Sequence, residues 1–155
     1  MSDDKANEPE KKMTFRCPAC GDKLSFLGGT VIRLMGRVHA EHFSCSTMFY
    51  IPAKLGQYGA IVGEGLQLRE GAKVEFECPN GACRKNLTTA YNPDLAEIGM
   101  SDEEGREFSV VFGKRYGSRA TFLVDIKRRS LVQSYGEHAS AFGIDFDKQL
   151  NFFGD

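Results

Sequence analysis

Short runs in which apolar and polar residues alternate follow one another from residue 13 onward, with glycine or proline between them. Successive side chains of a strand point to opposite faces of a sheet, so this period of two is typical of half-buried strands. The 17 glycines add many turn positions. The pattern predicts a mostly β protein with small antiparallel sheets. Strands are expected at residues 13–16, 23–27, 30–35, 38–51, 66–69, 73–77, 108–112, 120–126 and 131–135.

Glycine, proline and asparagine mark the expected breaks between these elements. Gly36 is expected to end the strand that starts at residue 30, because glycine weakens a strand interior. The strands at 108–112 and 120–126 are expected to pair through a turn-like connection. Asn92 and Pro93 suit the cap and first turn of a helix that reaches Ile98. One or two short helices are therefore expected beside the sheets.

Composition and charge limit the classes of function. The chain has 155 residues, of which 41% are hydrophobic and 26% charged, as in ordinary soluble proteins. Its formal net charge of −1 gives no overall attraction to nucleic acid, so such contact requires a local patch. No stretch approaches 18 consecutive apolar residues, and residues 1–12 are charged where a signal peptide is apolar. The expected location is the cytoplasm, where the five cysteines stay reduced and available to a metal ion.

Two short cysteine segments read like copies of one another. The first is Phe15-Arg16-Cys17-Pro18-Ala19-Cys20, followed by Leu24, and the second is Phe76-Glu77-Cys78-Pro79-Asn80-Gly81-Ala82-Cys83, followed by Leu87. In each, an extended run enters a Cys-Pro turn that brings a second thiol round to the same side. Four thiolates from two such turns are enough to close a tetrahedral zinc site. We therefore expect one structural zinc ion bound by Cys17, Cys20, Cys78 and Cys83.

These two Cys-Pro turns, each with a leucine-containing exit, resemble the two knuckles of zinc-ribbon proteins. The resemblance covers about thirty residues and points to no particular family. It implies small antiparallel sheets organised around the metal site. The chain departs from the usual ribbon in the wider spacing of Cys78 and Cys83 and in the long stretch between the half-sites. The first turn also resembles a rubredoxin knuckle, which makes iron the alternative to zinc.

On this basis the chain divides into three parts. Residues 1–12 are polar, of mixed charge, and expected to form a disordered tail. Residues 13–91 are expected to form a zinc-ribbon-like β domain with an insert between the knuckles. Residues 92–155 are expected to form a β-rich C-terminal part, either within the same domain or beside it.

His42 and Cys45 provide an alternative ligand pair. Together with Cys17 and Cys20 they would make a compact finger, and their surroundings faintly resemble the middle of a LIM finger. Cys45 with His39 or His42 is also the candidate pair for nucleophilic chemistry, although residues 42 and 45 of an extended strand face opposite sides. A lone cysteine such as Cys45 is equally typical of a small buried apolar position.

A basic segment follows the strand predicted at 108–112. With Tyr116 available for stacking, its cations could hold phosphate groups. A solvated hairpin surface, or a contact with the acidic residues 102–104, is the alternative interpretation. The basic residues are Lys114, Arg115, Arg119, Lys127, Arg128 and Arg129.

The sequence as a whole favours a protein without catalytic activity of its own. Four thiolates leave the metal no open position, so a site of that kind does not activate water. The leading hypothesis is an accessory subunit or regulator of a larger complex, bound to a protein partner or a larger enzyme. The alternatives are a nucleic-acid-binding regulator that uses the basic segment, and a Cys/His enzyme or rubredoxin-like iron protein.

Overall fold

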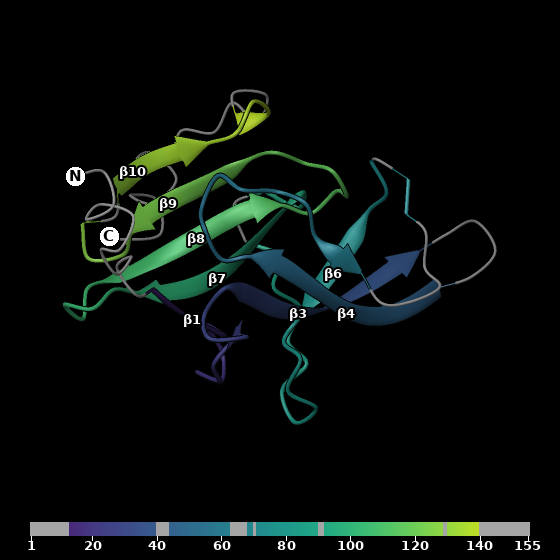
Figure 1. Ribbon diagram of the computed structural model, residues 1–155, viewed down its shortest axis with the longest axis horizontal. Helices are drawn as coiled ribbons and strands as arrows, with labels where there is room; N and C mark the ends of the chain where they lie inside the picture. Colours follow the sequence, from purple (N-terminus) through teal and green to yellow (C-terminus); the bar gives the residue numbers. More distant parts are fainter. Residues whose placement is uncertain are drawn as a thin grey trace, which may run out of the picture.

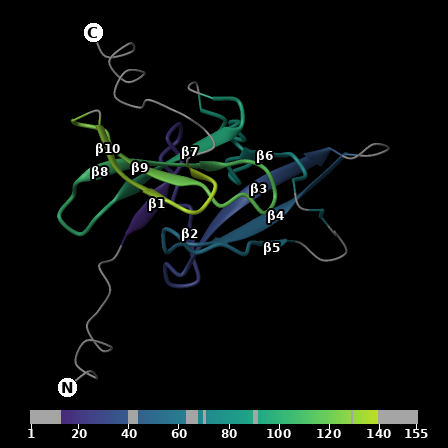
Figure 2. The ribbon, with the colours of Figure 1, turned by 90° about the horizontal axis from the view of Figure 1, so that it is seen from above.

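The computed structural model describes residues 13–39, 44–62, 68–69, 71–89, 92–128 and 130–139. In this part of the chain all regular structure is β, arranged as two antiparallel sheets (Figure 1). Turned by 90°, the molecule shows the strands β7 to β10 on one side and β2 to β5 on the other (Figure 2). The predicted mostly β class is therefore confirmed for the described residues. They contain no helix of the length and apolar character that crossing a membrane requires.

The first sheet has five strands in the order β1-β7-β8-β9-β10. The expected pairing of two strands across the segment 113–119 is confirmed, because Phe112 lies opposite Thr121 and Phe108 opposite Asp125. The expected strand near residue 131 adds to the edge of β9. The strands are β1 (Thr14–Arg16), β7 (Leu95–Ser101), β8 (Glu107–Gly113), β9 (Thr121–Asp125) and β10 (Ser130–Tyr135).

The second sheet is built around its longest hairpin, β3 and β4, which pair over nine residue pairs from Val31 opposite Pro52 to His39 opposite Ser44. The short strands β2 and β6 both pair with β3, and β5 pairs with β4. Of the strand predicted at 66–69, residues 66 and 67 lie outside the described part, and Leu68 and Arg69 are not in a strand. The strands are β2 (Ser25–Phe26), β3 (Val31–His39), β4 (Ser44–Pro52), β5 (Ile61–Val62) and β6 (Val74–Glu77).

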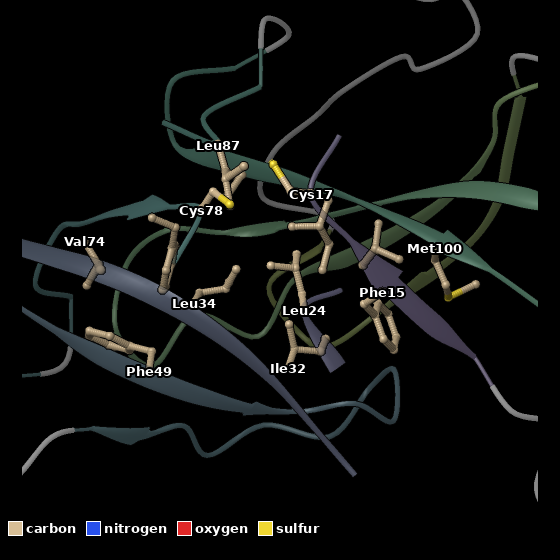
Figure 3. Close-up of a cluster of buried hydrophobic side chains, with 14 of the residues drawn as sticks. Phe15, Cys17, Leu24, Ile32, Leu34, Phe49, Val74, Cys78, Leu87 and Met100 are labelled. Carbon is tan, nitrogen blue, oxygen red and sulfur yellow. The ribbon is translucent and has the colours of Figure 1, made fainter. Parts of the chain in front are cut away.

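An apolar core lies between the sheets (Figure 3). Leu34 and Phe49 enter it from the β3–β4 hairpin, and Ile98 and Val110 enter it from β7 and β8. Phe76 stands edge-on to Phe49, with ring centroids 5.4 Å apart. Burial of such side chains contributes about 1.5–3 kcal/mol each, so this shared core is the main attraction between the two sheets. A smaller cluster around Leu95, Val111 and Phe122 lies on the other face of the first sheet.

The predicted helix near residue 95 is wrong. Residues 95–101 form β7, whose burial alternates with a period of two over most of its length. The capping residue acts locally as expected, because the Asn92 side chain accepts a hydrogen bond from the Asp94 amide at 2.8 Å. That bond closes a turn rather than starting a helix, since Leu95, Ile98 and Met100 are buried by strand pairing on both edges of β7. Tertiary pairing here outweighs the local cap signal.

The predicted break at Gly36 is also wrong, because β3 runs through it without interruption. Its partner across the hairpin is Thr47, and the ring of Phe49 lies directly over the glycine. A Cβ atom at position 36 would stand 2.3 Å from Cε1 of Phe49. Glycine is therefore required for packing at this position rather than for a turn.

Replacing Gly36 with alanine is expected to lower the free energy of unfolding by about 1–3 kcal/mol, the usual cost of overpacking a core. Urea denaturation measures this change. Gly81→Ala is the matched control, because a Cβ there meets no atom within 4 Å. Replacing the aromatic ring with a smaller side chain in the double variant Gly36→Ala/Phe49→Leu should recover part of the lost free energy of unfolding. Equal stability of Gly36→Ala and the parent protein would contradict the packing argument.

Candidate metal centre

The four cysteines of the two Cys-Pro segments converge on one point. Their sulfur atoms all lie within 4.8 Å of one another. The sulfurs of Cys17 and Cys83 are 3.9 Å apart, and those of Cys20 and Cys78 are 3.7 Å apart. A tetrahedral ion with metal–sulfur bonds of about 2.3 Å separates its ligands by about 3.8 Å, whereas a disulfide requires about 2.05 Å. The spacing fits four thiolates around one ion.

Strand β3 explains how the two turns meet. β2 and β6 lie end to end along the same edge of β3, since the opposite edge is occupied by β4. Leu24, which ends the first turn, accepts a hydrogen bond from the amide of Arg33, and Glu77, which begins the second, pairs with Met35. Both turns therefore leave β3 within two residues of one another. Pairing register brings together thiols that are 58 and 66 residues apart in sequence.

Strand β7 has the same role in the other sheet. β1, which leads into the first turn, pairs with its C-terminal half, and Arg16 lies opposite Gly99. The residues that leave the second turn lie along the same edge, where Leu87 accepts a hydrogen bond from the Glu97 amide and Thr88 bridges to Ala96. The first turn thus passes from the β7 sheet to the β3 sheet, and the second passes back. The metal site lies where the chain crosses between the sheets.

The two turns are structural copies as well as sequence copies. The amide of Cys17 donates to the carbonyl of Asp22, and the amide of Cys78 donates to that of Lys85. Each leucine exit then pairs back to a phenylalanine entry: Leu24 with Phe15 at 2.7 Å, and Leu87 with Phe76 at 2.8 Å. The wider spacing of the second pair is absorbed inside its turn. The likeness of the two cysteine segments to one another therefore extends to their backbone hydrogen bonds.

Each turn contains a left-handed residue directly after its second cysteine. Gly21 has φ of +78°, which glycine adopts without steric cost, while the equivalent Arg84 has φ of 49°. The side chain of Arg84 is held at 2.8 Å by Glu77, a buried carboxylate that also pairs with Arg37 at 3.2 Å. This ion pair between a partly exposed arginine and a buried carboxylate helps to hold the conformation that a non-glycine residue disfavours.

A direct hydrogen bond joins the two turns beside the sulfurs. The Asn80 side-chain amide donates to the carboxylate of Asp22, and its carbonyl oxygen accepts from the Ala82 amide at 2.9 Å. Asn80 thus shapes its own turn and contacts the other one. The two half-sites are held in place by protein contacts as well as by any ion.

The centre has a buried inner side and an exposed outer side. Cys17 and Cys78 are 2% and 0% exposed, and Figure 3 shows both at one end of the core beside Leu87. Cys20 is exposed and Cys83 is half-buried. Each turn therefore contributes one inner thiol and one outer thiol.

The clustered thiols influence one another's pKa values because their sulfurs lie close together. Burial opposes ionisation of Cys17, but hydrogen bonds from the amides of Cys20 and Ala19 outweigh it and lower the pKa. Burial and the neighbouring sulfurs of Cys20 and Cys17 raise the pKa of Cys78 far above its usual range. The Asp22 amide favours the thiolate of Cys20, yet burial and the sulfurs of Cys17 and Cys83 leave its pKa raised. One thiolate is thus favoured at the cost of the others, and a divalent cation would stabilise all four.

The alternative ligands do not belong to this group in the described residues. Cys45 lies in β4 opposite Val38, half-buried, with its sulfur 3.9 Å from the carbonyl of Ser46. His42 and the side chain of His39 lie outside the described residues. Among the described residues, the group with metal-binding spacing is Cys17, Cys20, Cys78 and Cys83.

The assignment of Lys114 to a phosphate-binding surface is wrong, because its side chain is 2% exposed. Its ammonium group donates to Glu75 at 2.6 Å, to the Thr88 hydroxyl at 2.7 Å and to the Pro93 carbonyl at 3.0 Å. All three of its protons are used. Lys114 is a buried structural cation that connects β6, the exit of the second turn and the end of β8.

The remaining basic residues fall at two ends of the β8–β9 hairpin. Arg115 and Arg119 flank the connection before β9, and each pairs with an exposed carboxylate, Asp94 and Glu137 respectively. Lys127 and Arg128 follow β9 at its opposite end. Arg129 lies outside the described residues. The described basic side chains therefore do not form one continuous stripe.

Sequence reasoning identified the four thiols but not the polar groups that surround them. Repeated flanking residues and cysteine spacing indicated the thiols. Glu77, Arg84, Asp22 and Asn80 had no such signal, because charged and amide residues are common next to turns. Their roles depend on contacts between segments far apart in the chain.

Comparisons with known proteins provide no further assignment. No family model, curated protein or solved structure matches the chain. What can be said of its function therefore depends on the geometry of the centre: four clustered cysteines with the spacing of a metal site, in a fold of two small antiparallel sheets.

Proposed function

We propose that this protein binds one structural zinc ion through Cys17, Cys20, Cys78 and Cys83 and acts without catalysis as an interaction module in a larger assembly. The observation that carries the proposal is the convergence of four thiols at tetrahedral spacing. All-thiolate tetrahedral sites are typical of structural zinc. Reduced thiols are needed for this role, which agrees with a cytoplasmic location.

The proposed ion would join the two sheets at the point where the chain crosses between them. Each turn enters from one sheet and leaves into the other, so an ion bound to both turns connects β1, β2, β6 and the residues before β7. A cation at this place also removes the repulsion between neighbouring thiolates. Coupled metal binding and folding contributes an apparent free energy of about 10–16 kcal/mol in zinc-finger peptides at pH 7.

The proposed absence of catalysis follows from the closed ligand set. With four protein sulfurs around it, zinc has no position for water or substrate. The same thiolates would also bind iron, giving a rubredoxin-like centre. Zinc is preferred because the second pair has a four-residue spacing rather than the two-residue spacing of the first.

Strand β10 supplies the surface for the proposed protein partner. It is the edge of its sheet, and Leu131 and Val132 are exposed on it. An edge strand offers unpaired backbone groups, to which an extended segment of another protein can add as a further strand. Exposed apolar side chains on such an edge favour this mode over a free edge, which proteins usually protect with charge. An accessory subunit bound through β10 is the form of interaction that the fold supports best.

The test is affinity purification of the tagged protein from its native cells, followed by elemental analysis of the isolated complex. We expect one zinc per chain, no visible colour and a protein partner in constant ratio. Recombinant protein loaded with Co²⁺ should show the absorption of a tetrahedral tetrathiolate. The matched control is Leu131→Lys/Val132→Lys, which should keep the zinc and lose the partner.

Three results would each overturn a part of the proposal. Protein without stoichiometric metal, in which all four thiols react freely, would remove the zinc site. Protein with a red ferric chromophore would assign iron in its place. A partner that is retained by the β10 variant would remove the docking surface while leaving the metal site intact.

A further inference from the structure

A cavity of about 270 Å³ lies between the sheets, away from the cysteine centre. One wall is formed by the β3–β4 hairpin, through Ile32, Leu34 and Ile51, and the opposite wall by Ile98 and Val110 of β7 and β8. The segment between β4 and β5 arches across the β8–β9 side of the molecule (Figure 1), and its residues 54–60 line the cavity, which is open to solvent. This space is part of neither the metal centre nor the β10 edge.

The segment between β4 and β5 is held in place by contacts with β9 and β10. The hydroxyl of Tyr58 makes a hydrogen bond to the Thr121 hydroxyl at 3.1 Å. Gly56 packs against the ring of Tyr135, and its φ of +89° suits glycine. A Cβ at Gly136 would come within 2.5 Å of the Tyr58 hydroxyl. The fold thus brings two glycines and two tyrosines together to keep this wall against β9 and β10.

The interior of the cavity is apolar. Its walls include aromatic and aliphatic side chains from both sheets, among them Phe49, Phe76 and Phe112. Well-formed ligand pockets have this character, with a small number of polar groups at fixed places. An apolar cavity of about 150 Å³ is known to bind benzene, so 270 Å³ accommodates roughly ten non-hydrogen atoms.

The charged residues that line the cavity are all cationic. They are Lys54, Lys114, Arg115 and Arg119, and no carboxylate is found among the described lining residues. The ammonium of Lys114 is occupied by Glu75, and the guanidinium of Arg115 donates a hydrogen bond to the Gly71 carbonyl at 3.2 Å. Lys54 is exposed, and Arg119 makes an exposed ion pair with Glu137 at 3.4 Å. Such exposed pairs contribute little, so these cations remain available to an anion.

We propose that the cavity binds a small amphiphile with one carboxylate head and a saturated apolar body of about eight carbons. The body would lie between the sheets, and the head would meet Lys54 and Arg119 at the rim. Charge complementarity selects the head, and cavity size and apolar walls select the body.

The same features disfavour other classes of ligand. A nucleotide has about twenty or more non-hydrogen atoms, roughly twice the number that the cavity accommodates. A neutral hydrocarbon would fill the interior but would leave the cationic rim without a role. A medium-chain carboxylate uses both parts of the site.

Octanoate, which has ten non-hydrogen atoms, is the probe for this site. Isothermal titration of the zinc-loaded full chain should show octanoate binding at least tenfold tighter than 1-octanol and than butanoate. Octanoate should also shift the methyl NMR signals of Leu34 and Ile98, which line the cavity. Equal affinity for octanoate and 1-octanol would overturn the carboxylate assignment. No shift at these methyl groups would overturn the location.

Variants test the two parts of the site separately. Lys54→Glu/Arg119→Glu changes exposed side chains and should weaken octanoate binding at least tenfold, with little effect on 1-octanol. Ala60→Leu, which adds volume to the lining, should weaken both ligands. Arg128→Glu is the matched control, because Arg128 is 84% exposed and lies at the other end of β9. Unchanged octanoate binding by the first variant would overturn the proposed role of the rim.

Discussion

Replacing Cys78 with serine is expected to abolish stoichiometric metal binding and to remove most of the cooperative unfolding transition. Cys78 is fully buried, and a serine hydroxyl is a poor substitute for a zinc thiolate. Coupled zinc binding is worth an apparent 10–16 kcal/mol in small systems, which is about the total stability of an ordinary domain. Elemental analysis and urea denaturation followed by circular dichroism measure the two effects.

Cys45→Ser is the matched control for this prediction. It also replaces a cysteine with serine, but Cys45 lies in β4 outside the group of four. It should retain one metal ion per chain and change the unfolding free energy little. If Cys78→Ser kept its metal and its stability while Cys45→Ser lost them, the ligand assignment would be wrong. A strong chelator should reproduce the effect of Cys78→Ser on the parent protein.

Replacing Lys114 with methionine is expected to lower the free energy of unfolding by about 3–5 kcal/mol, the usual cost of removing one partner of a buried ion pair. Methionine keeps much of the length of the side chain but leaves the carboxylate of Glu75 without its cation at 2.6 Å. The Thr88 hydroxyl and the Pro93 carbonyl lose the same partner. Thermal and urea denaturation measure the loss, and Lys127→Met, at an exposed position, should change stability little.

The pH dependence of this loss identifies its cause. Burial opposes ionisation of Glu75, but hydrogen bonds and attraction from Lys114 outweigh it and keep the pKa below the ordinary 4.5. A carboxyl whose pKa is lower in the folded state than in the unfolded state stabilises the fold at pH values above its unfolded-state pKa. This stabilisation disappears as the pH falls through the folded-state pKa. In Lys114→Met, the half-buried carboxylate of Glu75 keeps only the more distant, exposed Lys73 at 3.6 Å as a cationic partner, so protonation in acid relieves part of the cost of its charge. The stability gap between parent and variant should therefore narrow below about pH 4.5, and a gap that stays constant to pH 3 would point to packing alone.

Residues whose roles are local were predictable from the sequence. Alternation at 108–112 and 120–126 predicted two strands that pair, and the repeated flanks of Cys17 and Cys78 predicted two matching turns. In both cases neighbouring residues contain the whole signal. The thiol cluster was predictable for the same reason, although its closing distance depends on the register along β3.

Residues whose roles depend on distant contacts were predicted wrongly or missed. Asn92 does close a turn, but the apolar residues after it are buried by strands on both sides, and so a strand replaces the expected helix. Gly36 has an ordinary strand conformation, and only the ring of Phe49 explains why it is glycine. Lys114 belongs by sequence to a basic segment, yet it is enclosed by residues that lie 21 to 39 positions away.

The crossing of both turns between the sheets also sets the order of events during synthesis. A chain that has emerged only as far as β4 offers two of the four clustered thiols, Cys17 and Cys20, since Cys45 of β4 lies outside the group, and two thiolates cannot saturate a tetrahedral ion. The second pair is separated from the first by 58 to 66 residues, and its position also depends on β7, which is made later. Capture of the proposed ion is therefore expected late in maturation, after the strands have paired, and the free thiols of the nascent chain are expected to be open to oxidation until then.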